Sequence, residues 1–190
     1  MTETAMIVGV GGQGTLLASR ILGYVMMKKG LDVKISEVHG MSQRGGSVVT
    51  YVRYGDKVYS PIADLGTADM IISFERLEAA RWLPYLKQGG KIVMNTQKID
   101  PMPVITGVSE YPDDIEDNLR GKGICVTAVD ALSLAEAAGT AKAVNTVLLG
   151  VCAKQSGFSR DMFYDAIENT VKPKFIEINK KAFDLGYDAG

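Results

Sequence analysis

The sequence predicts an α/β fold in which helices cover both faces of a mixed, mostly parallel sheet. Apolar residues 5–8 run into "GVGGQG" at residues 9–14 and then into a helical pattern, the order of a nucleotide-binding strand, turn and helix. The β-branched stretch "SVVTYVRY" at residues 47–54 then interrupts the alternation of strands and helices. Beyond it, the alternation resumes. We therefore expect a three-layer α/β/α sandwich with an antiparallel hairpin after the second strand.

Hydrophobic periodicity, with glycines and prolines as boundaries, gives the elements in order. Strands are predicted over residues 5–10, 31–38, 47–54, 70–74, 91–95 and 123–129. Helices are predicted over residues 15–29, 76–86, 131–138 and 144–155, followed by a helical C-terminal third from residue 160. Gly30 is expected to end the first helix and Gly89-Gly90 the second, while Pro173 interrupts the C-terminal region. The first three elements form a β-α-β unit, so the fold begins in a Rossmann-like way.

The expected order then departs from a Rossmann-like fold. Gly55-Asp56-Lys57 separates residues 47–54 from Val58-Tyr59, which predicts a hairpin turn where a helix would otherwise follow. "DPMP" at residues 100–103 places two prolines in a loop or at a sheet edge. Because that segment is short and apolar stretches flank it, residues 1–190 are predicted to form a single domain.

Composition argues against several classes of protein. The chain has 190 residues, a formal net charge of -1 and no run of five like charges, so neither nucleic acid nor an anionic membrane is an expected partner. No signal segment is recognised, and no apolar stretch approaches the roughly 20 residues of a membrane span, so we expect a cytoplasmic protein. Cys125 and Cys152 stand far apart in apolar contexts. They are predicted to be buried, reduced thiols without a metal.

The glycine turn is compatible with dinucleotide binding. Gly9, Gly11 and Gly14 fit the G-x-G-x-x-G spacing that brings backbone N–H groups against a pyrophosphate. Glu37, 23 residues beyond Gly14, could bind a ribose as in NAD sites. However, His39 is the one histidine, the chain is too short for a second domain, and no nucleophile and base stand together. A stand-alone Rossmann-like NAD(P)-binding oxidoreductase, or a nucleotide-binding module, remains the alternative.

Two motifs are predicted to share one crevice at the carboxyl edge of the sheet. One interpretation of the glycine turn is that it serves only the close approach of strand and helix, but Gln13 is expected to point at a phosphate, a cofactor or another chain. The loop "HGMSQRGG" after the second strand offers a cation, an amide and a hydroxyl to an anion. The candidate binding residues are Gly11, Gly12, Gln13, Gly14, Ser42, Gln43, Arg44, Gly45 and Gly46. No catalytic residue is assigned.

These motifs carry a resemblance to a known family. "GVGGQG", "SEVHGMSQRGGSV", "AVNTVLLG" and "AFDLGY" together resemble the gamma subunit, or gamma domain, of 2-oxoacid:ferredoxin oxidoreductases. The similarity covers essentially the whole chain. Within the family, the "EVHGMSQRGG" loop looks most like that of the small (beta) subunit of indolepyruvate:ferredoxin oxidoreductase.

The resemblance implies an enzyme subunit that is inactive alone. Large partner subunits would hold thiamine diphosphate, Mg²⁺ and [4Fe-4S] clusters, decarboxylate the 2-oxoacid to an acyl-CoA and reduce ferredoxin, as in anaerobic metabolism. This chain would bind no cofactor by itself. It would border the approach of coenzyme A and the subunit interface, with a homodimer expected when the chain is isolated.

Overall fold

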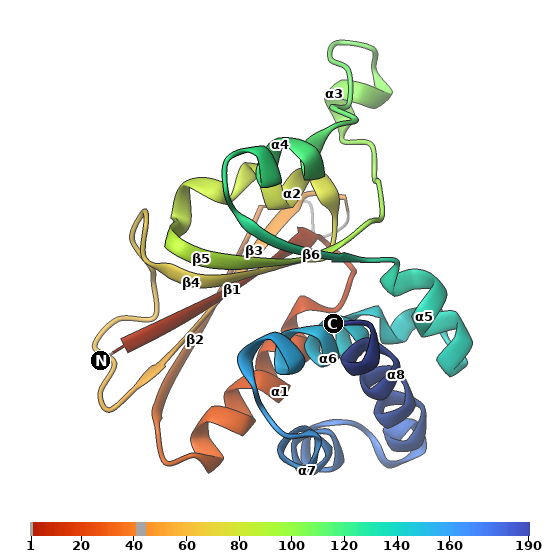
Figure 1. Cartoon of the computed structure of the whole chain (residues 1–190). Coiled ribbons are helices and arrows are strands. Elements are labelled where there is room, and N and C mark those ends of the chain that lie inside the picture. Colours follow the sequence, from red (N-terminus) through yellow and green to blue (C-terminus); the bar gives the residue numbers. More distant parts are fainter. Residues whose placement is uncertain (1, 41–44) are drawn as a thin grey trace.

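A computed structural model describes residues 2–40 and 45–190, built on one six-stranded sheet of order β2-β3-β1-β4-β5-β6 (Figure 1). The strands are β1 (Thr2–Val10), β2 (Asp32–His39), β3 (Ser47–Gly55), β4 (Ala68–Ser73), β5 (Leu86–Asn95) and β6 (Cys125–Val129). Strands β1, β4, β5 and β6 run parallel, whereas β3 pairs antiparallel with both β1 and β2. The predicted mixed, mostly parallel sheet is confirmed.

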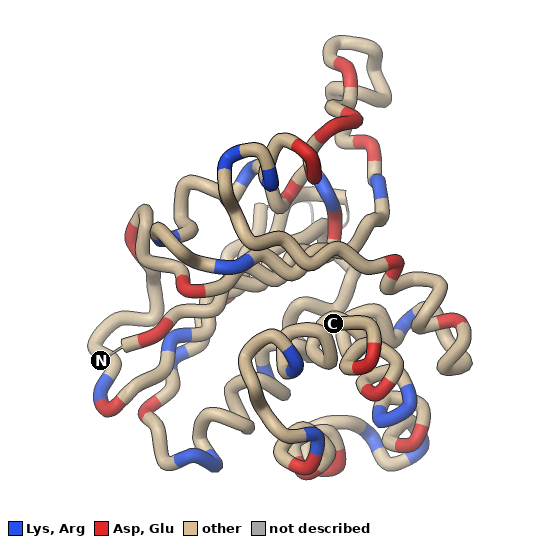
Figure 2. The backbone as a smooth tube through the Cα atoms, viewed as in Figure 1, with Lys and Arg blue, Asp and Glu red and all other residues tan. Residues whose placement is uncertain are grey.

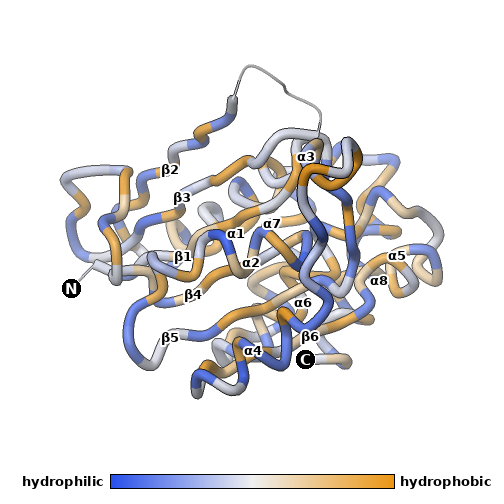
Figure 3. The backbone as a smooth tube through the Cα atoms, turned by 90° about the horizontal axis from the view of Figure 1, so that it is seen from above, coloured by the Kyte–Doolittle hydropathy of each residue, from blue (hydrophilic) through white to orange (hydrophobic). Residues whose placement is uncertain are grey.

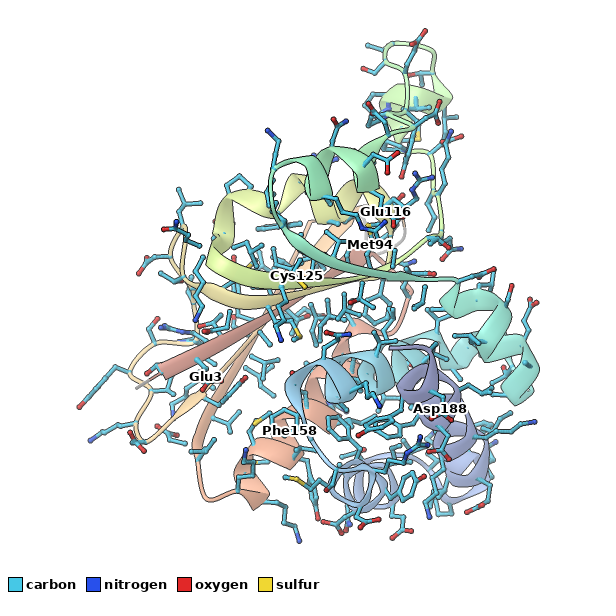
Figure 4. The ribbon with its side chains drawn as sticks, in the orientation of Figure 1. Glu3, Met94, Glu116, Cys125, Phe158 and Asp188 are labelled. Carbon is cyan, nitrogen blue, oxygen red and sulfur yellow. The ribbon has the colours of Figure 1, made fainter. Side chains whose placement is uncertain are left out.

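Helices cover both faces of this sheet (Figure 1). They are α1 (Thr15–Lys28), α2 (Arg76–Arg81), α3 (Met102–Ile105), α4 (Ile115–Gly121), α5 (Ala131–Ala138), α6 (Val144–Ser156), α7 (Arg160–Thr170) and α8 (Ile176–Ala189). Helices α2 and α4 lie on one face, and α1 with α5 to α8 on the other. Each face has its own apolar cluster. Met94, labelled in Figure 4, belongs to the cluster beneath α2 and α4.

The antiparallel hairpin lies elsewhere than predicted. It joins β2 to β3, with His39 opposite Val48 and Asp32 opposite Gly55. Residues 56–67 contain no strand, so the predicted partner at Val58-Tyr59 is wrong. The physical reason is that β1 and β2 already pair with both edges of β3. Consequently β2 does not pair with β1, and the expected β-α-β unit has β3 inserted between its strands.

Three further local predictions need correction. The second helix ends at Arg81, and a 3₁₀ turn at Leu83–Tyr85 follows because Pro84 cannot continue an α-helix. Gly89-Gly90 therefore lies within β5 rather than after a helix. Residues 102–105 of the "DPMP" region form the short helix α3. Helix α4 was not predicted, since only its residues Ile115 and Leu119 are buried in its single apolar stripe.

Two glycines let α6 and α8 pack in direct backbone contact. A Cβ atom on Gly150 would lie within 3.0 Å of the carbonyl oxygen of Phe183, and one on Gly186 within 3.0 Å of the carbonyl oxygen of Val147. The same helices carry the "AVNTVLLG" and "AFDLGY" motifs. Both motifs therefore include a glycine that this helix pair requires.

Candidate functional site

The glycine turn joins the end of β1 to the start of α1. Gly12 and Gly14 have φ values of 100° and 89°, in the region that favours glycine, and Gly14 is the N-cap of α1. Gly9 serves a close approach instead, because a Cβ atom there would lie 2.7 Å from Gln13 Oε1 and 2.9 Å from Phe74 Cβ. Each of these glycines is thus required by local geometry before any ligand is considered.

The turn contacts the end of the second motif. Gly11 donates its backbone N–H to the carbonyl oxygen of Gly46 at 2.9 Å. Gly45 has a φ of 79°, and Gly46 immediately precedes β3. The other candidates of that loop, Ser42, Gln43 and Arg44, lie outside the described residues. The described ends of the two motifs thus meet at one edge of the sheet.

The side chain of Gln13 is directed inward, contrary to the expectation that it points at a ligand or another chain. Its Oε1 accepts from the N–H of Val10 at 2.7 Å. Its Nε2 donates to the carbonyl oxygen of Phe74 at 3.1 Å and to Gln97 Oε1 at 3.2 Å. The amide therefore braces the turn against the ends of β1 and β4. Residue type alone could not give this direction.

Glu37 and His39 lie beside the turn on β2. Glu37 Oε2 accepts from Thr15 Oγ1 at 3.5 Å and from Thr50 Oγ1 at 3.3 Å, so the carboxylate has partners within the chain. His39 is exposed, and its Nδ1 lies 3.0 Å from the carbonyl oxygen of Gly40. Glu37 thus links the start of α1 to β3 through two threonine hydroxyls.

Residues of the turn line two cavities. The N–H groups of Gly12, Gly14 and Thr15 form no hydrogen bond with another described residue. A cavity of about 270 Å³ lies on the β2 side and is lined by Gly11, Gly12, Gly14, Thr15, Leu16, Glu37, His39 and Val48. A second, of about 540 Å³, lies on the α6 side and is lined by Gly12, Gln13, Gly14, Leu17, Gln97, Ile99, Leu132, Ala141, Lys142, Val144 and Asn145. Free N–H groups at the start of a helix favour an anion.

Lys142 and Asn145 extend the site beyond the residues that the sequence predicted. Asn145 is buried, and its Nδ2 donates to the carbonyl oxygen of Gly14 at 3.4 Å. Lys142 is exposed at the mouth of the second cavity and forms no ion pair with a described residue. Asn145 belongs to the "AVNTVLLG" motif, so the sequence contained a signal that it is functional. The sequence contained no such signal for Lys142, because only folding brings that residue close to the turn.

The cysteines differ in their surroundings. Cys125 is exposed on β6, which corrects the prediction that it is buried (Figure 4). Cys152 is buried as predicted, and burial raises the pKa of its thiol to about 12. A [4Fe-4S] cluster takes four thiolates, whereas this chain has two cysteines. Across residues 2–40 and 45–190, no cluster of three His, Cys, Asp or Glu side chains could hold a metal ion.

The described helices include none long and apolar enough to cross a membrane.

Fold and site together define an α/β domain with a glycine turn at the start of α1, in which no described residues form a set of catalytic groups. Residues 4–189 match the family described as pyruvate ferredoxin/flavodoxin oxidoreductase, and the chain belongs to that family. The family resemblance that the sequence motifs predicted is confirmed.

Relatives match over nearly the full chain. The indolepyruvate oxidoreductase subunit IorB of Pyrococcus horikoshii is 43% identical, with 97% of this chain and 94% of the relative covered. The same subunit of Thermococcus kodakarensis is 42% identical over the same shares. The "common subunit gamma" of pyruvate/ketoisovalerate oxidoreductases from Thermococcus kodakarensis is 26% identical, covering 95% of this chain and 92% of that one.

Solved structures share the fold. The gamma subunit of a keto/oxoacid ferredoxin oxidoreductase from Geobacter sulfurreducens superposes with a TM-score of 0.73 at 22% identity, covering 98% of this chain and 97% of that one. A pyruvate oxidoreductase subunit from Thermotoga maritima has a TM-score of 0.75 at 21% identity, covering 98% and 96%. At these identities the likeness establishes the shared α/β fold.

Proposed function

We propose that this chain is the small subunit of an indolepyruvate:ferredoxin oxidoreductase. The observation that carries the proposal is the 43% identity to an IorB subunit across 97% of the chain. The enzyme would decarboxylate an aryl 2-oxoacid oxidatively, form an acyl-CoA and reduce ferredoxin. The stand-alone NAD(P) oxidoreductase is not supported, since Glu37 is engaged by two threonines and the relatives are subunits of oxoacid oxidoreductases.

The reactive groups would belong to the larger subunits. Thiamine diphosphate, Mg²⁺ and the [4Fe-4S] clusters supply the decarboxylation and electron transfer there, and two cysteines cannot supply the four ligands of a cluster here. Residues 1–190 would act as one gamma-type domain. Its task would be to complete the assembly and to border the path by which coenzyme A reaches the reactive centre.

The glycine turn offers what the phosphates of coenzyme A need. In this proposal the N–H groups of Gly12, Gly14 and Thr15 donate to phosphate oxygens, while Lys142 and Arg44 add positive charge. The remaining candidate residues act as a frame, because the N–H of Gly11 and the amide of Gln13 are already bonded within the chain. The alternative role for the same donors is to hold the large subunit beside the turn.

The test uses the assembled enzyme, in which the chain is co-expressed anaerobically with its large subunit. Lys142→Ala and Arg44→Ala should each raise the KM for coenzyme A about tenfold, since a charge-assisted bond contributes roughly 1.5 kcal/mol. Thiamine-dependent decarboxylation should be unchanged. Lys122→Ala is the matched control, an exposed lysine at the end of α4 that forms no ion pair with a described residue.

Three results bear on separate parts of the proposal. Intact assembly with an unchanged KM for coenzyme A would remove the phosphate role. A higher kcat/KM for pyruvate or 2-oxoglutarate than for indolepyruvate would contradict the proposed substrate. Failure of the wild-type chain to bind any thiamine-dependent partner would remove the subunit role altogether.

A further inference from the structure

Residues 100–110 form an arm that projects from the body between β5 and α4, with α3 at its tip (Figure 1). The arm exposes three large apolar side chains: Met102 and Ile105 are 66% exposed and Val108 is 80% exposed. In Figure 3 the orange colour around α3 marks its residues as hydrophobic. Such side chains gathered at the tip of a projection are typical of an interaction surface.

The arm is held in shape by its own hydrogen bonds. The N–H groups of Val108 and Ser109 both donate to the carbonyl oxygen of Pro103, at 2.8 and 3.0 Å. Thr106 donates its N–H and its hydroxyl to the carbonyl oxygen of Met102, each at 2.9 Å. A partner would therefore meet a preformed surface, which lowers the entropic cost of binding.

One buried carboxylate holds both stems of the arm. Glu75 is 1% exposed. Its Oε1 accepts from the N–H of Ile99 at 3.1 Å, before the arm, and from the hydroxyl of Tyr111 at 2.5 Å, after it. Glu75 follows Phe74, whose carbonyl oxygen accepts from Gln13 of the glycine turn. The arm therefore rises from the same edge of the sheet as the candidate site.

The base of the arm is acidic (Figure 2). Residues 98–114 contain four carboxylates and one lysine. Lys98 lies 3.8 Å from both Asp100 and Asp113, so it is shared between them. Glu110 and Asp114 are exposed and form no ion pair with a described residue. A surface that fits this arm would combine an apolar hollow with a basic rim.

We propose that the arm inserts its apolar tip into a basic-rimmed hollow of the large subunit and thereby sets that subunit against the glycine turn. This inference rests on the proposed function, because the large subunit is the partner it names. The direction of the arm, fixed at Glu75, would determine how the two chains are oriented.

The experiment measures binding between this chain and the tagged large subunit by anaerobic co-purification and by titration. Ile105→Asp and Val108→Asp should each weaken binding at least tenfold while leaving the Tm of the isolated chain unchanged. Glu110→Lys should also weaken binding, most strongly at low salt, because charge steering is screened by ions. When an arm variant is added in saturating amount, the activity of its complex with the large subunit should return to the wild-type value.

Two substitutions serve as matched controls. Leu65→Asp makes the same chemical change at a 67% exposed residue in the 56–67 connection, at the opposite edge of the sheet. Glu136→Lys reverses an exposed carboxylate on α5 that forms no ion pair with a described residue. Both should bind like the wild type.

Equal binding of wild type, Ile105→Asp and Val108→Asp would overturn the docking role and leave the subunit proposal intact. Equal losses in the arm variants and in Leu65→Asp would also overturn it. A wild-type chain that forms a dimer by light scattering, with a monomeric Ile105→Asp variant, would assign the arm to a second copy instead. If the wild type binds no large subunit at all, the proposed function itself fails.

Discussion

Replacing Gly186 by alanine tests the close packing of α6 on α8. The added Cβ would fall within 3.0 Å of the carbonyl oxygen, carbonyl carbon and Cα of Val147, and these backbone atoms cannot rotate away. Overpacking of this kind costs about 1–3 kcal/mol, and a backbone clash belongs at the upper end. Alanine favours a helix over glycine by up to about 1 kcal/mol, so the net loss should be about 2 kcal/mol.

For a domain of this size, about 2 kcal/mol corresponds to a fall in Tm of roughly 4–8 °C. Thermal and urea unfolding of the purified chain, followed by circular dichroism, would measure it. Gly121→Ala is the control, because Gly121 ends α4 and no atom lies within 4 Å of its added Cβ. That variant should be neutral or slightly more stable. A Tm for Gly186→Ala that equals the control would refute the packing argument.

Further predictions concern thiols, pH and the glycine turn. A thiol reagent should modify Cys125 in the native chain and Cys152 only after unfolding; rapid reaction of both would contradict the described burial. Burial raises the pKa of Tyr51 to about 12, from about 10 when unfolded. The contribution of Tyr51 to stability is therefore complete below pH 10 and lost from about pH 10 to 12. Tyr51→Phe should reduce, but not abolish, the loss of urea-measured stability over that range, because burial also raises the pKa of Tyr54 and Tyr111. Gly14→Ala should lower the free energy of unfolding by about 1–2 kcal/mol, since φ is 89° there and its Cβ would press on Asn145. An unchanged urea midpoint would contradict this.

Much of the fold could be predicted because its signals are local. The helix over residues 131–138 matches α5 residue for residue, and Gly30 follows the last turn of α1 with a φ of 80°. The insertion of β3 between β2 and β1 could not be predicted from the sequence, because strand order depends on pairing between distant segments. Gly89-Gly90 resembled a helix end, yet the pair lies within β5, where the register with β4 shifts between the pairs Ala68–Leu86 and Met70–Lys91.

The candidate site likewise has features that the sequence predicts and features that depend on contacts between distant residues. The conformation of the glycine turn follows from its spacing, and the structure has Gly12 and Gly14 at positive φ. The inward direction of Gln13 depends on Phe74 and on residues after β5, more than 60 positions away. Asn145 meets Gly14 across 131 residues of sequence, a contact that only the folded chain makes.

Anaerobic co-expression of this chain with its large subunit, followed by an assay of ferredoxin reduction with indolepyruvate and coenzyme A, tests the central claim most directly. We expect activity only when both chains are present, dependent on coenzyme A, and none from this chain alone. An isolated chain that binds NAD(H) saturably and turns over without a partner would contradict the account.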